Sequence, residues 1–452
     1  MKFQKWGLIL LFFFIAFGNS DTKIIYWFFQ SGVGGPVYNY YNFVITSLLV
    51  GFLLYIKYFK MDEPPLTNHQ LIPKNSGISM AIMLWFLAAT LSLIKNISVG
   101  EVIKNHISGV MIPVVIYLAL RRISLTKTDI NRILTAVSLG ILTTLVLGLL
   151  AYYQEWGFPS LATLAYSKYS LVRMERFMNV TYGNVGLTAQ LLLLTGPPLL
   201  ASIFDRNKSK KLRLWFGFCV FLIGLNLLIL QSLTALIVFI LIFILILAFQ
   251  KRYKLLLMML ILAVVLPLVF RDFLLDVSYL LLGRQGSVLE RIGAMQEGWG
   301  VFLDNWIFGV GKGVSYLYLS ADTAHQFFIQ QAVELGVLGF IASLLLVGMV
   351  FTRLLIIYIQ RHRNPDSETR FLFIIGPFSY LLYGVIANIT TNIGTLNIWI
   401  NLLFGCLSLV DFVPANKNIS IGQKTTALPQ INGVKAPVNS DPIETSSDKK
   451  VE

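Results

Sequence analysis

A single histidine lies where a polar segment meets a long apolar run. His325 belongs to the stretch TAHQFFIQQAVELGVLGF, Thr323–Phe340, and only four histidines occur in the 452 residues. An imidazole has an ordinary pKa of about 6.5, so it can take a proton from a hydroxyl group near neutral pH. The sequence therefore indicates His325 as a candidate catalytic base.

Polar residues recur every four positions beside this histidine, at Asp322, Gln326, Gln330 and Glu334. On a helix they form one polar stripe that drifts slowly around the axis, and this stripe could line a wet groove or face solvent. Glu334 is about 13 Å from His325 along a helix, which is too far to orient the imidazole ring. The residue that sets the histidine tautomer stays open among three candidates: Glu290, Glu297 and Tyr316.

Another helix is predicted within GRQGSVLERIGAMQEGWGVFLDNWIFG. Ser287 and Glu290 form a capping box, a serine N-cap with glutamate three residues later. Apolar residues then follow at helical spacing: Leu289, Ile292, Met295 or Gln296, Trp299, and Phe302 or Leu303. We expect this amphipathic helix to lie on the outer surface of the membrane that the chain spans, with its aromatic face in the membrane–water interface.

Arg284 and Arg291 bracket the start of that helix and are typical of an anion site. Backbone N–H groups and the helix dipole favour anions there, and guanidinium groups add two-point hydrogen bonds to phosphate oxygens. The arrangement suits a diphosphate, which Glu290 would oppose somewhat; the alternative is an ordinary amphipathic helix with solvated arginines. The following GVGKGVS lacks the spacer of a P-loop, and its glycines suit a tight turn toward His325.

The elements that position these residues are predicted to be membrane helices. Hydrophobic residues make up 56% of the chain and charged residues only 13%, whereas soluble domains carry about 25% charged residues. Cys219 and Cys406 lie inside apolar stretches and are interpreted as small apolar thiols. Apolar stretches of membrane-spanning length predict an all-α polytopic protein with about twelve spans, near residues 6–19, 40–59, 77–95, 107–120, 132–153, 183–204, 213–230, 233–250, 255–270, 335–354, 371–390 and 394–411. The first of these spans could instead be a cleaved signal peptide.

The positions of lysine and arginine predict which loops are cytoplasmic. Basic segments occupy every second loop: KYFKMDEPPLTNHQLIPK, RRISLTKTDINR, DRNKSKKLR, QKRYK and RHRNPDSETR. Residues 1–411 then form an integral membrane domain, and residues 412–452 form a polar, disordered cytoplasmic tail. Most of the net charge of +14 is therefore explained by topology, and no nucleic-acid partner is expected.

Two longer segments are expected on the outer side and keep basic residues against this bias. One runs from about Gln154 to Gly183, and the other, the large external loop, covers about 271–334. Their basic residues are Lys168, Arg173, Arg176, Arg271, Arg284, Arg291 and Lys312. These cations either serve a function, or bind lipid headgroups, or pair with Glu155, Glu175, Glu290 and Glu297.

The late part of the chain resembles the O-antigen ligase and O-antigen polymerase superfamily. The resemblance rests on GRQGSVLERIGAMQEGW, NWIFGVGKGVSYL and TAHQFFIQQAVELGVLGFIASLLLV, within about Gly283–Leu346, and above all on HQxxxQxxxELGxxG after a glycine-rich turn. The layout of about twelve helices with a large late external loop extends the likeness to most of the chain. Two positions depart from the usual pattern: Gln326 replaces an asparagine after the histidine, and Ser232 precedes Leu233 where many members have arginine.

The resemblance implies a multi-pass glycosyltransferase of the bacterial inner membrane. Such an enzyme transfers a glycan from an undecaprenyl-diphosphate carrier to an acceptor hydroxyl on the periplasmic face, without a metal or other cofactor. His325 would be the catalytic histidine, Arg284 and Arg291 would bind the diphosphate, and Arg176, with Arg173 nearby, would add basic contacts. Besides membrane lipids, the partners would be the lipid-linked donor and an acceptor, either the lipid A-core or another lipid-linked glycan. Protein is a third acceptor option.

The residues themselves are compatible with that chemistry. Loss of a diphosphate from an anomeric carbon needs stabilisation of negative charge, which outward arginines supply, and a base for the acceptor hydroxyl. No DxD pair or cluster of carboxylates and histidines occurs in the external loops, so a metal mechanism is not expected. Attack opposite the leaving group predicts inversion at the anomeric carbon.

Two other classes of function remain as alternatives. Some relatives in the superfamily are linked to inorganic carbon uptake, which would make the chain a membrane transporter. Coupled transporters usually carry ionisable residues within their spans, and the predicted spans have almost none at their centres. A scaffold protein would not need arginines grouped with a histidine.

Overall fold

The computed structural model describes residues 77–96, 100–120, 127–156, 185–205, 208–229, 233–269, 285–320, 323–324, 326–361, 367–387 and 398–410. Four of the predicted site residues, Arg173, Arg176, Arg284 and His325, lie outside these ranges. The predicted spans at 6–19 and 40–59 and the tail at 412–452 also lie outside them.

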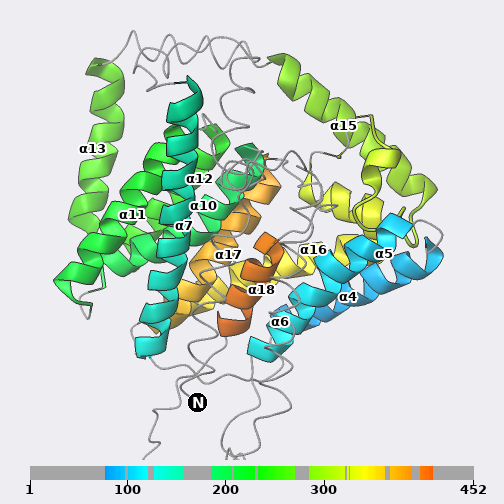
Figure 1. Ribbon diagram of the computed structural model, residues 1–452, viewed down its shortest axis with the longest axis horizontal. Coiled ribbons are helices and arrows are strands. Elements are labelled where there is room, and N and C mark those ends of the chain that lie inside the picture. Colours follow the sequence, from blue (N-terminus) through cyan, green and yellow to red (C-terminus); the bar gives the residue numbers. More distant parts are fainter. Residues whose placement is uncertain are drawn as a thin grey trace, which may run out of the picture. The chain divides into compact units, whose positions relative to one another are not determined.

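All regular elements in the described ranges are helices (Figure 1). They are α4 (Gly77–Lys95), α5 (Gly100–His106), a π-helical turn (Ile107–Met111), α6 (Ile112–Leu120), α7 (Lys127–Trp156), α10 (Val185–Ile203), α11 (Lys210–Ile229), α12 (Leu233–Phe249), α13 (Tyr253–Val269), α15 (Gln285–Asp304), a 3₁₀ turn (Ser315–Leu317), α16 (Phe327–Gln360), α17 (Ser367–Ala387) and α18 (Ile398–Val410). The predicted all-helical class is confirmed for this part of the chain.

Within the described ranges, three helices are both long and apolar enough to cross a membrane: Gly77–Lys95, Phe327–Gln360 and Ser367–Ile386. Shorter apolar helices occupy Gly109–Leu118, Ala189–Ile203 and Thr234–Phe249. Each lies within or overlaps a predicted span. The chain is therefore a membrane protein, and a total of about twelve spans stays a prediction.

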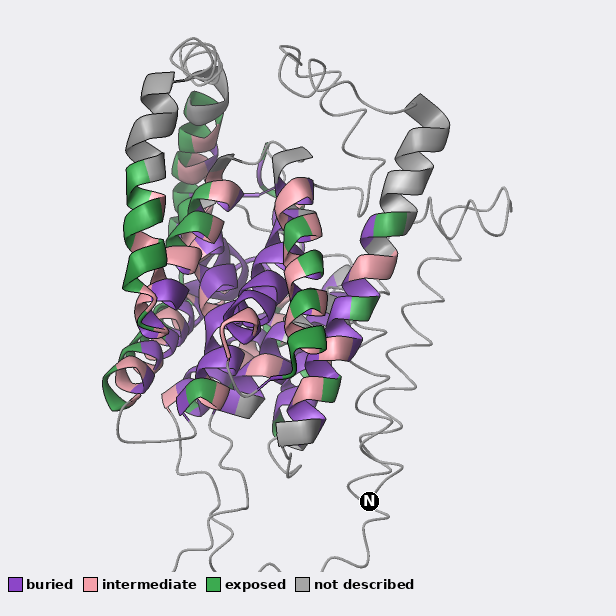
Figure 2. Ribbon diagram, turned by 90° about the vertical axis from the view of Figure 1, so that its left-hand side faces the viewer, coloured by how far each residue is buried: buried purple, intermediate pink, exposed green. Residues whose placement is uncertain are grey.

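The helices pack around two central elements. α16 packs against α4, α17 and α15, whereas α10 packs against α17, α11 and α12. Buried residues concentrate where these helices meet, and exposed residues mark the outer faces (Figure 2). Exposed apolar side chains such as Leu214 and Phe221 on α11 and Leu257 on α13 are typical of helix faces that contact lipid.

α15 begins at Gln285, two residues before the predicted N-cap. Ser287 therefore lies in the first helical turn, and the prediction that it caps the helix is wrong. The predicted apolar stripe is largely exposed, at Leu289, Ile292, Trp299 and Leu303, as expected for a helix that offers this face to a membrane surface. Phe302 is the exception, because it is buried in a small cluster with Ala324 and Val333.

α16 contains a break close to the predicted start of its span. The helix begins at Phe327, eight residues before 335, but Gly336 has φ 69° and ψ −162°, which no helix contains. Such a conformation is essentially restricted to glycine. The predicted membrane span at 335–354 thus corresponds to the part of α16 after the break, and the first part, Phe327–Leu335, carries Gln330 and Glu334 of the predicted polar stripe.

Candidate functional site

The break in α16 is bridged by the glycine-rich segment at residues 305–314. Val337 N donates to Trp306 O (2.8 Å), Val310 N donates to Val333 O (2.9 Å), and Gly311 N donates to Glu334 O (3.1 Å). Backbone groups that the broken helix leaves unpaired are therefore satisfied by the loop.

Glycine is required where the two backbones cross. A Cβ on Gly309, whose φ is +69°, would lie 2.4 Å from the Glu334 carbonyl, and a Cβ on Gly336 would lie 2.3 Å from Ile307 O. The glycines were expected to form a tight turn, and the structure gives them the additional role of allowing this close approach.

A buried ion pair crosses the same junction. Lys312 Nζ lies 2.6 Å from Glu334 Oε2, and both side chains have an exposed fraction of 0%. The ammonium group also lies 5.7 Å from the centre of the Trp85 ring in α4. The alternatives that Lys312 binds lipid headgroups or pairs with Glu155, Glu175, Glu290 or Glu297 are therefore wrong, because its partner is Glu334 and the pair holds the loop to α16.

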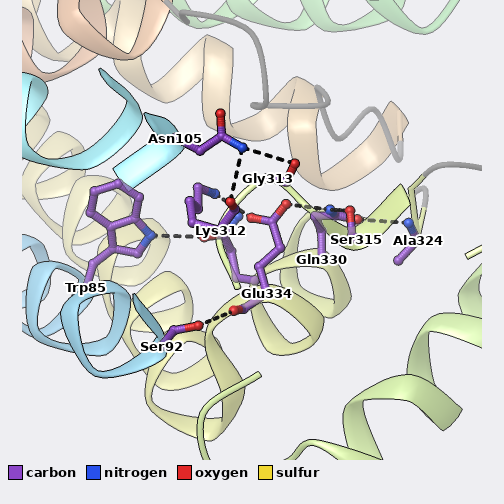
Figure 3. Close-up of polar contacts among 10 residues, drawn as sticks. Trp85, Ser92, Asn105, Lys312, Gly313, Ser315, Ala324, Gln330 and Glu334 are labelled. Atoms are coloured by element: carbon purple, nitrogen blue, oxygen red, sulfur yellow. Dashed lines mark hydrogen bonds and ion pairs between the residues drawn. The ribbon is translucent and has the colours of Figure 1, made fainter. Parts of the chain in front are cut away.

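Gln330 extends this pair into a chain of hydrogen bonds (Figure 3). Its Nε2 donates to Glu334 Oε1 (2.8 Å) and to Ser315 Oγ (2.6 Å), and its Oε1 accepts from Ala324 N (2.8 Å). Gln330 and Glu334 are both fully buried. The predicted polar stripe thus neither lines a wet groove nor faces solvent at these two positions.

The chain neighbours of His325 are both held in place. Ala324 donates its N–H to Gln330, and Gln326 is the N-cap of α16, with its side chain accepting from Ile329 N at 2.6 Å. No more than one peptide unit separates the histidine from an anchored residue on either side, and consecutive Cα atoms are about 3.8 Å apart. The two residues that flank position 325 are therefore both held by hydrogen bonds.

α15 contacts Ala324 through the helix face that carries Gly298. A Cβ on Gly298 would lie 2.7 Å from Ala324 Cβ, so only glycine allows the observed approach. Ala294 and Arg291 precede Gly298 by four and seven residues, and such spacing places all three on one face of the helix. Arg291 is half-buried and lies about 10 Å along the axis from the point of contact.

Glu297, on α15, binds Ser320 in the loop that precedes Ala324. Its carboxylate accepts from Ser320 N (3.0 and 3.2 Å) and from Ser320 Oγ (2.7 Å). This glutamate was one of the candidates for orienting the histidine ring, and its described role is to hold Ser320. Glu290 is exposed on the surface of α15.

The predicted site is thus only partly described. The structure places Arg291 on the helix face that contacts the neighbour of His325, while Arg284 immediately precedes α15 in the chain. Lys312, Gln330 and Glu334 form a buried cluster that the sequence motifs did not predict. The spacing of Gln326, Gln330 and Glu334 could have predicted this cluster. Polar side chains that are buried on an apolar helix are expected to have hydrogen-bond partners.

A family model described as O-Antigen ligase matches residues 218–344. The match includes Arg284, Arg291 and His325 together with both members of the buried ion pair, while Arg173 and Arg176 precede it. No curated protein matches the chain. The family match supports the O-antigen ligase and polymerase superfamily and, with the apolar helices, a membrane enzyme of this type.

Proposed function

We propose that this O-antigen ligase-type membrane enzyme transfers a glycan from undecaprenyl diphosphate to an acceptor hydroxyl on the outer face of the bacterial inner membrane. The observation that carries the proposal is the contact of α15 with the segment around His325, made by Gly298 and Ala324. This contact brings the helix that carries Arg291 to the chain segment that carries the proposed base. The chain is proposed to cross that membrane several times.

In the proposed reaction, the acceptor oxygen attacks the anomeric carbon as the bond to the diphosphate breaks. His325 takes the proton of the acceptor hydroxyl, and the undecaprenyl diphosphate leaves with the bonding electron pair. Arg284 and Arg291 stabilise the charge on the leaving group, because guanidinium groups offer two-point hydrogen bonds to phosphate oxygens. Arg173 and Arg176 are proposed as further diphosphate contacts, and the mechanism requires no metal.

The helical geometry of α15 supports this division of roles. Arg291 lies about 10 Å along the axis from Gly298, on the same helix face. A base and a phosphate-binding cation must flank a sugar that is joined to a diphosphate, so they have to be separated rather than adjacent. In-line attack inverts the anomeric configuration, and NMR assignment of the product as retained would contradict it.

The direct test is transfer by the purified protein in lipid, with a lipid-linked oligosaccharide as donor. Separate reactions contain lipid A-core, a second lipid-linked glycan, or a protein acceptor, because the acceptor class is not fixed by the site. His325→Ala should abolish transfer, and Arg284→Ala and Arg291→Ala should raise the KM for the donor. Arg252→Ala, between α12 and α13, removes an arginine on the predicted cytoplasmic side and should leave donor KM unchanged. Normal turnover by the His325 variant would exclude it as the base.

A further inference from the structure

One hydrogen-bonded chain connects a buried ion pair to the residue before His325. It runs from Lys312 Nζ to Glu334 Oε2 (2.6 Å) and from Glu334 Oε1 to Gln330 Nε2 (2.8 Å). It continues from Gln330 Oε1 to Ala324 N (2.8 Å). Resting on the function proposed above, we infer that Gln330, oriented by this ion pair, is a positioning residue for the base His325.

The ion pair fixes which way the Gln330 amide faces. A carboxylate only accepts hydrogen bonds, so the amide must present its Nε2 donors to Glu334. Its second Nε2 hydrogen is taken by Ser315 Oγ at 2.6 Å. The oxygen is therefore left for the N–H of Ala324, and an amide turned the other way would lose the contacts with Glu334 and with Ala324.

The Gln330 amide in this orientation restrains Ala324, the residue that precedes His325. Ala324 is held by Gln330 on one side and packed against α15 at Gly298 on the other. Gln326 follows as the N-cap of α16. Because position 325 lies between these two anchors, loss of the Ala324 bond would release the histidine backbone from one end. A base displaced by about 1 Å can lose on the order of 100-fold in rate.

The adjacent Gln331 provides a matched control. It lies on the same helix with an exposed fraction of 3%, and its Oε1 accepts from Trp85 Nε1 at 2.9 Å. Gln330→Met and Gln331→Met therefore remove the same side-chain amide from neighbouring buried positions, but only the first removes the bond to Ala324. General damage to the core would affect both variants.

The experiment measures kcat, donor KM and hydrogen exchange of the Ala324 amide. Gln330→Met should lower kcat on the order of 100-fold, with donor KM unchanged and faster exchange at Ala324. Gln331→Met should retain slow exchange at Ala324 and far more of the kcat. Gln330→Glu, with the new carboxyl group protonated against the Glu334 carboxylate, keeps a donor for Glu334 and an acceptor for the Ala324 N–H, so it should retain protection and more of the kcat than Gln330→Met.

Several results would overturn the inference. One is equal loss of kcat in the two methionine variants, and another is unchanged Ala324 exchange in Gln330→Met. If Gln330→Met does not fold, loss of Ala324 protection in the folded Gln330→Glu protein would overturn it as well. Failure of the proposed function is a separate outcome, seen as absent transfer by the wild-type protein or normal transfer by His325→Ala. In that case the exchange measurement still shows whether Gln330 holds Ala324, which distinguishes the two failures.

Discussion

At the scale of residues, the junction between α16 and the loop at residues 305–314 contains buried polar side chains that have hydrogen-bond or ion-pair partners. Lys312 and Glu334 have no solvent exposure, and each has further contacts, with the Trp85 ring and with Gln330 respectively. A buried pair of this kind adds little net stability relative to apolar residues, but removal of one partner is costly. In this protein the ion pair fixes the loop at residues 305–314 against α16.

Lys312→Met is expected to lower the free energy of unfolding by about 3–5 kcal/mol, because it leaves Glu334 buried without its cation. The double variant Lys312→Met/Glu334→Gln removes both charges and keeps an acceptor for Gln330, so it should recover most of this loss. Denaturant unfolding in mixed micelles measures both variants. A double variant as unstable as the single one would mean that charge pairing is not the source of the effect.

At the scale of elements, the site depends on close approach of helices rather than on large apolar side chains. α16 is broken at Gly336, and its unpaired backbone groups bond to the loop at residues 305–314. α15 then reaches Ala324 at a glycine. Small residues at both contacts bring the arginine-bearing helix and the histidine-bearing segment together.

Gly298→Ala is expected to separate these two elements, since its Cβ would lie 2.7 Å from Ala324 Cβ and 3.2 Å from Ile329 Cγ2. A displaced α15 should lower kcat by on the order of tenfold or more. The Cβ of Gly293→Ala on the same helix would meet nothing within 4 Å. This variant should therefore catalyse glycan transfer at the wild-type rate, and its helix should gain about 1 kcal/mol of stability. Transfer kinetics and thermal unfolding distinguish the variants, and equal activities would contradict the role assigned to the contact.

At the scale of the whole molecule, hydrophobic patterning predicted the helices better than it predicted the junctions between them. The described helices follow the expected spans, because stretches of apolar residues have few other structures in a membrane. The break at Gly336 and its pairing with residues 306–311 were not predicted, because backbone hydrogen bonds between distant segments leave no periodic pattern of side chains. The partner of Lys312 was missed for a related reason: Glu334 was considered only as a possible partner of His325.

Two side chains, Lys95 and Arg361, join segments that are predicted to lie on the same side of the membrane. Lys95 Nζ, at the C-terminal end of α4, donates to Asn305 Oδ1 at 3.4 Å, and both residues are predicted to lie on the outer side. Arg361, in a predicted cytoplasmic segment, donates to the carbonyl oxygens of Ala248 and Phe249 at the C-terminal end of α12, which is also predicted to be cytoplasmic. Each contact joins segments that the lysine and arginine bias places on one side. The packing and the charge pattern are therefore mutually consistent.

Sidedness is tested by cysteine labelling in a variant with Cys219 and Cys406 replaced by alanine. Tyr318→Cys is expected to react with a membrane-impermeant maleimide in intact spheroplasts, because this exposed residue follows α15 in the external loop. Lys254→Cys, an exposed position in the first turn of α13, should react only after permeabilisation and serves as the control. Undecaprenyl-diphosphate-linked glycans are used on the outer side in the proposed reaction, so the base and its arginines must also face outward. Labelling of Tyr318→Cys only after permeabilisation would place this loop in the cytoplasm and exclude the proposed reaction.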